Sequence, residues 1–105
     1  MIHPDTELRT FDPAVGVGVR VAARIARGTL LWVRDRFDVV LDPAEVESLP
    51  PLLWAQLDRL GYRDARGQFI LCWDAGKHVN HSCAPAMRGV GHDAMIAVRD
   101  LRPGD

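Results

Sequence analysis

The segment Val79–Pro85 holds the residues whose types and spacing could do chemistry. It reads Val-Asn-His-Ser-Cys-Ala-Pro, so an amide, an imidazole, a hydroxyl and a thiol follow one another. Asn80 and His81 present both hydrogen-bond donors and acceptors, and the small Ser82 and Cys83 allow tight packing beside them. Such groups are costly to bury unless each finds a partner. The segment therefore indicates either a binding site or a polar turn between two strands.

A second pattern lies early in the chain. From Val15 to Ile25, valines alternate with small or polar residues, which is the two-residue period of a strand. Gly16 and Gly18 occupy the positions between the valines, so they lie on the opposite face of the predicted strand. Because glycine has no Cβ, one face of this predicted strand is bare and another group can approach its backbone.

The elements that must position these two segments are mostly short strands. Apolar runs predict further strands at 29–33, 37–41, 69–73 and 95–98. Strands of this length around one small helical insert exclude a helical bundle and a βαβ repeat. They favour a mainly β fold, that is, a β-rich α+β domain.

The helical insert is predicted between residues 42 and 61. Asp42, Pro43 and Glu45 have the spacing of a helix start, with a capping aspartate, a proline in the first turn and a glutamate three residues after the cap. A second helix is predicted over Leu52–Leu60, ending at Gly61.

Composition limits the class of protein further. The 105 residues suffice for one domain, and the net charge of −1 is unlike that of a polycationic nucleic-acid binder. Two cysteines define no disulfide framework, and no apolar run approaches the ~20 residues of a membrane helix. We expect a cytoplasmic protein that contacts neither nucleic acid nor membrane directly.

Three segments of the chain, which occur in the same order as in the family, resemble motifs of the SET domain family. Members of this family transfer a methyl group from S-adenosylmethionine to a protein lysine. Asn80–Pro85 is similar to the central signature of the family. The glycine strand at 15–19, followed by Ile25–Thr29, resembles its opening motif, and Ala97–Asp105 resembles its closing motif. The resemblance covers residues 15–105, which we expect to form the domain, with residues 1–14 as a loose lead-in.

The resemblance implies a SET-domain fold of short strands in small sheets, with a small helical insert and an incomplete pseudoknot. It implies that Gly16, Val17 and Gly18 lie against S-adenosylmethionine, and that Asn80 and His81 reach the same cofactor. The partner would be a protein that presents a lysine, whose neutral amine attacks the sulfonium methyl in line. An enzyme contributes to this reaction mostly by positioning and desolvation.

The sequence also departs from the family pattern. The catalytic tyrosine of the family follows the closing motif and would lie beyond Asp105, so no catalytic residue is expected among these residues, and methyl transfer by them alone should be weak or absent. Tyr62 matches no catalytic motif and is expected to be a packing residue. The family's asparagine after the central proline is Ala86 here, and its Arg-Phe pair before the signature is Lys77-His78.

Other site chemistries fit less well. Zinc ligand types occur at His78, His81, Cys83, His92 and Cys72. No Cys-x-x-Cys pair is present and the spacing matches no common site, so no metal is expected. A nucleophilic Cys83 lacks any indicated oxyanion hole. A dinucleotide fingerprint fails because Val21 occupies the third glycine position.

Two functions stay open. The first is an S-adenosylmethionine-dependent protein-lysine methyltransferase of bacterial type, because cysteine-rich flanking segments are absent. The second is a SET-like module that binds a cofactor or a protein without catalysis.

Overall fold

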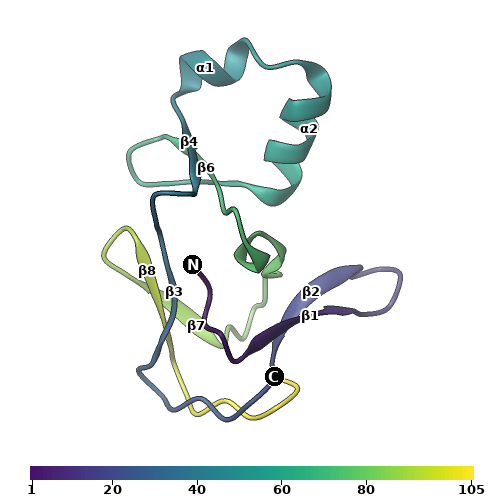
Figure 1. Ribbon diagram of the computed structural model, residues 1–105, viewed down its shortest axis with the longest axis vertical. Coiled ribbons are helices and arrows are strands. Elements are labelled where there is room, and N and C mark those ends of the chain that lie inside the picture. The colour runs from purple at the N-terminus through teal and green to yellow at the C-terminus, as the bar shows by residue number, and fades with distance from the viewer.

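Three small antiparallel sheets and two short helices make up the fold in the computed structural model, which describes residues 1–105 (Figure 1). The first sheet is the hairpin of β1 (Thr6–Thr10) and β2 (Val17–Val21). In the second sheet the strand order is β3 (Leu30–Val33), β8 (Ala94–Ala97) and β7 (Met87–Val90). In the third sheet it is β4 (Val39–Leu41), β6 (Phe69–Leu71) and β5 (Tyr62–Arg63). The helices are α1 (Pro43–Glu47), α2 (Pro51–Leu60) and a 3-10 turn, η1 (Ala75–His78). This arrangement confirms the predicted mainly β class.

The prediction of a loose lead-in over residues 1–14 is wrong in its secondary structure. Strand β1 pairs with β2 along its whole length, from Thr6 opposite Val21 to Thr10 opposite Val17. The backbone N–H of Ile2 donates to the Asp74 carboxylate at 2.7 Å. No apolar pattern marks β1 because backbone pairing holds this strand while most of its side chains remain exposed.

The two helices lie together at one end of the long axis, away from the β1–β2 hairpin (Figure 1). The predicted start of α1 is confirmed: the Glu45 carboxylate accepts the backbone N–H of Asp42 at 2.8 Å, as in a capping box. The predicted second helix is confirmed as α2, and its apolar side chains are only partly buried, since Leu57 is enclosed while Leu53 is half exposed. No helix is long and apolar enough to cross a membrane.

Gly61 ends α2 as predicted, but for a different reason. Its φ of −92° is ordinary extended backbone and not the left-handed conformation of a glycine cap. A Cβ at this position would lie 2.6 Å from the Leu57 carbonyl oxygen and 2.8 Å from that of Ile70. Glycine is needed because α2 and β6 approach one another closely here.

The largest group of buried apolar residues joins the start and the end of the chain. It consists of Val21, Ile25, Leu31, Ala97 and Leu101. Ile25 and Leu101 also form an antiparallel bridge, and Val21 exchanges backbone hydrogen bonds with Asp105 and Gly104 at 2.6 and 2.8 Å. The closing segment therefore lies beside the end of β2.

Candidate functional site

A cavity of about 400 Å³ lies where the three motif segments meet. The opening segment lines it with Val15 and residues 19–21, the central segment with residues 79–82 and 84–87, and the closing segment with Arg99, Leu101 and Asp105. These segments are far apart in the sequence. Their convergence on one space makes this cavity the candidate site, and its volume lies within the roughly 300–1,000 Å³ of small-molecule pockets.

Gly18 and Asn80 are in contact at this site. A Cβ on Gly18 would lie 2.4 Å from Asn80 Nδ2 and 2.8 Å from Cε2 of Phe11, closer than atoms can approach. The bare face of β2 is therefore occupied by the Asn80 side chain and the Phe11 ring. The absence of a side chain at Gly18 is what lets the central segment reach the opening strand.

Gly16 and Val17 lie elsewhere in the hairpin. Gly16 has φ +74°, and a Cβ there would meet nothing within 4 Å, so its role is to turn the chain between β1 and β2. Neither it nor the half-exposed Val17 lines the cavity, whereas Asn80 and His81 do. Contact of any of these residues with a cofactor remains a prediction.

The central segment has no regular secondary structure and is anchored at both ends. At its start Val79 donates its backbone N–H to Gly76 of η1 at 3.2 Å, and at its end Ala86 accepts from Val98 at 3.0 Å. Between these points the exposed Cys83 lies with its Sγ 4.0 Å from His81 Nε2. No three His, Cys, Asp or Glu side chains converge as a possible metal site.

The cavity also carries two arginines that the sequence analysis did not single out as site residues. Arg20 Nε donates to Glu7 at 2.8 Å, and this hydrogen bond lowers the pKa of the Glu7 carboxyl. Arg99 Nη1 donates to Asp105 at 2.7 Å and likewise lowers the pKa of that carboxyl. For Arg20 the available signal was its place two residues after Gly18, on the same face of a strand.

A second cavity, of about 290 Å³, adjoins the first, and Val79 and Met87 line both spaces. Its walls include Trp32, Tyr62 and Cys72. Trp32 and Tyr62 meet edge to face with ring centroids 6.1 Å apart. Tyr62 therefore does pack against a neighbour, as expected, but it also lines this cavity.

Burial governs the chemistry of the second cavity. It raises the pKa of Tyr62 to about 12 and that of the Cys72 thiol to about 11, so both groups are neutral near pH 7. The Trp32 indole N–H is buried and has no hydrogen-bond acceptor. The cavity thus offers aromatic surface, a neutral hydroxyl and one unused donor.

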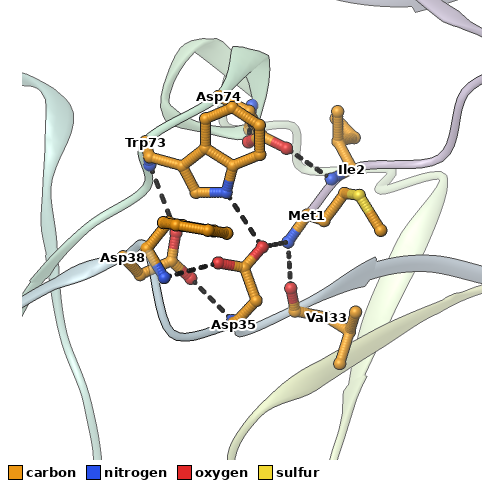
Figure 2. A network of polar contacts seen from close by, with 9 residues as sticks. Met1, Ile2, Val33, Asp35, Asp38, Trp73 and Asp74 are labelled. Atoms are coloured by element: carbon orange, nitrogen blue, oxygen red, sulfur yellow. Dashed lines mark hydrogen bonds and ion pairs between the residues drawn. The ribbon is translucent and has the colours of Figure 1, made fainter.

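A network of carboxylates holds η1, and with it the start of the central segment, against the sheets (Figure 2). Asp35 accepts the Trp73 indole N–H at 2.9 Å, and the buried Asp38 accepts the backbone N–H of Trp73 at 3.2 Å. Asp74 accepts the backbone N–H groups of Ile2 and Gly76 at 2.7 and 2.9 Å. The indole hydrogen bond lowers the pKa of Asp35, so this carboxylate is charged at neutral pH.

Comparison with known proteins identifies the fold. No family model matches the chain, and no curated protein is similar to it in sequence. A solved structure from Plasmodium falciparum, described as a "putative histone methyltransferase", superimposes with a TM-score of 0.65 at 18% identity. The match covers 99% of this chain and 90% of that one. At this identity the likeness establishes the fold alone, and the chain shares the fold of that Plasmodium protein over nearly its whole length.

Proposed function

We propose that this chain is a methyltransferase domain that binds S-adenosylmethionine in the cavity beside Asn80 and transfers its methyl group to a protein lysine. The observation that carries the proposal is the contact between Gly18 and Asn80 at a cavity lined by all three motif segments. The fold shared with a protein described as a "putative histone methyltransferase" supports the same reaction class.

The cavity has the features that this cofactor requires. Its volume of about 400 Å³ suits a nucleoside-sized ligand, and apolar residues such as Val19 and Leu101 form much of its wall. The Asn80 amide offers a donor and an acceptor for polar groups of the ligand. Bound there, S-adenosylmethionine would supply an electrophilic methyl group on a positively charged sulfur.

The second cavity is suited to the acceptor. The two cavities share Val79 and Met87 in their walls, so an amine entering past Trp32 and Tyr62 would come close to a cofactor bound in the first cavity. Aromatic walls hold an alkylamine by dispersion and cation–π attraction. An amine that has lost its proton to solvent could attack the methyl carbon; the new carbon–nitrogen bond would form as the carbon–sulfur bond breaks, and the sulfur would keep the bonding electrons.

A transfer assay tests this function. The 105 residues, and a longer form that adds a family-type tyrosine segment after Asp105, are each incubated with methyl-labelled S-adenosylmethionine and a protein lysate. We expect label on lysine side chains of one or a few proteins from the longer form, and weak or no label from the 105 residues alone. An Asn80→Ala variant should give no label. Absence of both labelling and cofactor binding in the unmodified protein would contradict the proposal. Binding without labelling would support the non-catalytic SET-like module in place of the enzyme.

A further inference from the structure

We propose that Lys77 is itself a methyl acceptor of this domain, so that the chain methylates a lysine of its own. The inference rests on the proposed function, which supplies the methyl donor, and it adds a substrate, namely an internal lysine of the same chain. Lys77 is the only lysine among the 105 residues. It also lines the second cavity, which is the one suited to the acceptor amine.

The position of Lys77 in the chain brings it to the boundary between the two cavities. Lys77 belongs to η1, and Val79, two residues later, lines both spaces. Asn80 follows directly and lines the cavity in which we place the cofactor. One residue therefore separates the only lysine from the wall that the acceptor cavity shares with the cofactor cavity.

The backbone of η1 is fixed against the wall of the second cavity. The Asp74 carboxylate accepts the backbone N–H of Gly76 at 2.9 Å, and the Gly76 carbonyl oxygen accepts that of Val79 at 3.2 Å. A Cβ on Gly76 would lie 3.1 Å from Cδ1 of Trp32, so the turn packs closely against this indole. Because the backbone is held here, Lys77 changes position by rotation of its own side chain.

The amine of Lys77, in contrast, is loosely held. Its Nζ donates to the Trp73 carbonyl oxygen at 3.4 Å, which is longer than the roughly 2.7–3.2 Å of an ordinary N–H···O hydrogen bond. No carboxylate forms an ion pair with Lys77, and no acidic side chain lines the second cavity. Since the four-carbon stem of lysine is flexible, the amine can leave Trp73 at little cost and enter the cavity.

The transfer step uses S-adenosylmethionine as its one co-reactant. Lys77 first releases a proton to water, because only the neutral amine has a lone pair that can attack. Nζ then bonds to the methyl carbon as the carbon–sulfur bond breaks. The sulfur keeps the bonding electrons, so the products are S-adenosylhomocysteine and a methylated Lys77. An acceptor in the same chain needs no encounter with a partner, which raises its effective concentration.

Site-resolved mass spectrometry tests the proposal. The 105 residues, and a longer form whose added tyrosine segment contains no lysine, are each incubated with S-adenosylmethionine and no other protein. We expect methyl groups on Lys77 in the longer form, and fewer or none in the 105 residues alone. Because the transfer takes place within one chain, the fraction methylated per unit time should not depend on protein concentration. A rate that rises in proportion to concentration would overturn transfer within the chain.

Two variants of the longer form control for the position of the lysine. Lys77→Arg keeps the positive charge but removes the acceptor, and it should carry no methyl group. The double variant Lys77→Arg/Arg24→Lys moves the only lysine to a site where the native side chain is 78% exposed and lines neither cavity. It should also stay unmethylated, with circular dichroism showing that it is folded. Methylation of this variant as fast as that of the unmodified chain would show that exposure, and not the cavity, selects the lysine.

Failure of this inference differs from failure of the proposed function. Methyl transfer to proteins of a lysate, with Lys77 unmethylated, would overturn the internal acceptor and leave the methyltransferase intact. If the longer form neither binds S-adenosylmethionine nor methylates any protein, both proposals fail.

Discussion

Gly18 and Gly16 are two glycines of the same predicted strand, but they have different structural roles. The position of Gly18 has no room for a methyl group, because Asn80 and Phe11 fill the space that a Cβ would need. Gly16 has open space around it but a φ of +74°, which only glycine adopts at little cost. One glycine permits a contact at the candidate site and the other permits a turn.

Alanine substitution at these two glycines should therefore have separable effects. Gly18→Ala must displace the Asn80 side chain or the Phe11 ring, and we expect it to weaken S-adenosylmethionine binding by tenfold or more. Gly16→Ala should lower the free energy of unfolding by about 1 kcal/mol through backbone strain and leave affinity nearly unchanged. Chemical denaturation and calorimetry measure the two quantities, and equal losses of affinity in both variants would refute the distinction.

Tyr62 is the only tyrosine, so its ionisation can be followed directly by near-ultraviolet absorbance. Burial raises its pKa from the ordinary 10.0 to about 12. As pH rises above 10, the unfolded chain loses this proton first, so the native state is progressively destabilised between pH 10 and 12. We expect a midpoint near 12 in the native protein and near 10 in denaturant. A native midpoint near 10, with tryptophan fluorescence unchanged, would place Tyr62 in solvent.

At the scale of elements, alternation and capping patterns predicted the strands and helix ends whose signals come from side chains close together in the sequence. Strand β2 and the start of α1 were found this way, because apolar periodicity and the Asp42–Glu45 spacing are local patterns. Strands β1 and β7 were not found. β1 is mostly exposed, and β7 contains a glycine and an arginine, so what makes them strands is backbone pairing with distant partners.

The junction between α2 and β6 gives a test at this scale. Gly61→Ala would put a Cβ within 2.6 Å of the Leu57 carbonyl oxygen, so we expect a loss of about 1–3 kcal/mol in the free energy of unfolding from overpacking. Gly89→Ala in β7 is the control, since its nearest neighbour would be Met95 Sδ at 3.7 Å, an ordinary contact. Urea denaturation compares the variants. A Gly61→Ala protein as stable as Gly89→Ala would show that the junction can relax.

At the scale of the whole molecule, the site depends on segments that the sequence does not bring together by itself. The motifs pointed to Asn80 and His81, which do line the cavity. Phe11 reaches the site at the end of β1, a strand that carries no apolar signal, and was not predicted as a site residue. Arg20 lies on β2, which was predicted as a strand, but its place in the cavity wall was not. A residue's chemistry can be read locally, whereas its neighbours across the cavity follow from topology.

The molecule is also loosely built for its length. Its radius of gyration is 14.4 Å, against about 13 Å for a compact domain of this size, and 11 of its 105 residues are buried. A small core leaves a thin margin of stability, so a bound ligand should contribute visibly. At a concentration about 100 times its dissociation constant, S-adenosylmethionine should add about 2.7 kcal/mol and raise the melting temperature by several degrees or more. A melting curve that does not move with millimolar cofactor would count against the cavity.

Calorimetric titration of S-adenosylmethionine into the full-length protein and its Asn80→Ala variant tests the central claim most directly. Asn80 bridges the opening strand and the cavity without contributing to the buried core, so removing its amide should leave the protein folded. We predict measurable binding by the unmodified protein and none by Asn80→Ala, with unchanged circular dichroism. Equal affinity in the two proteins would show that the meeting point of Gly18 and Asn80 is not the cofactor site.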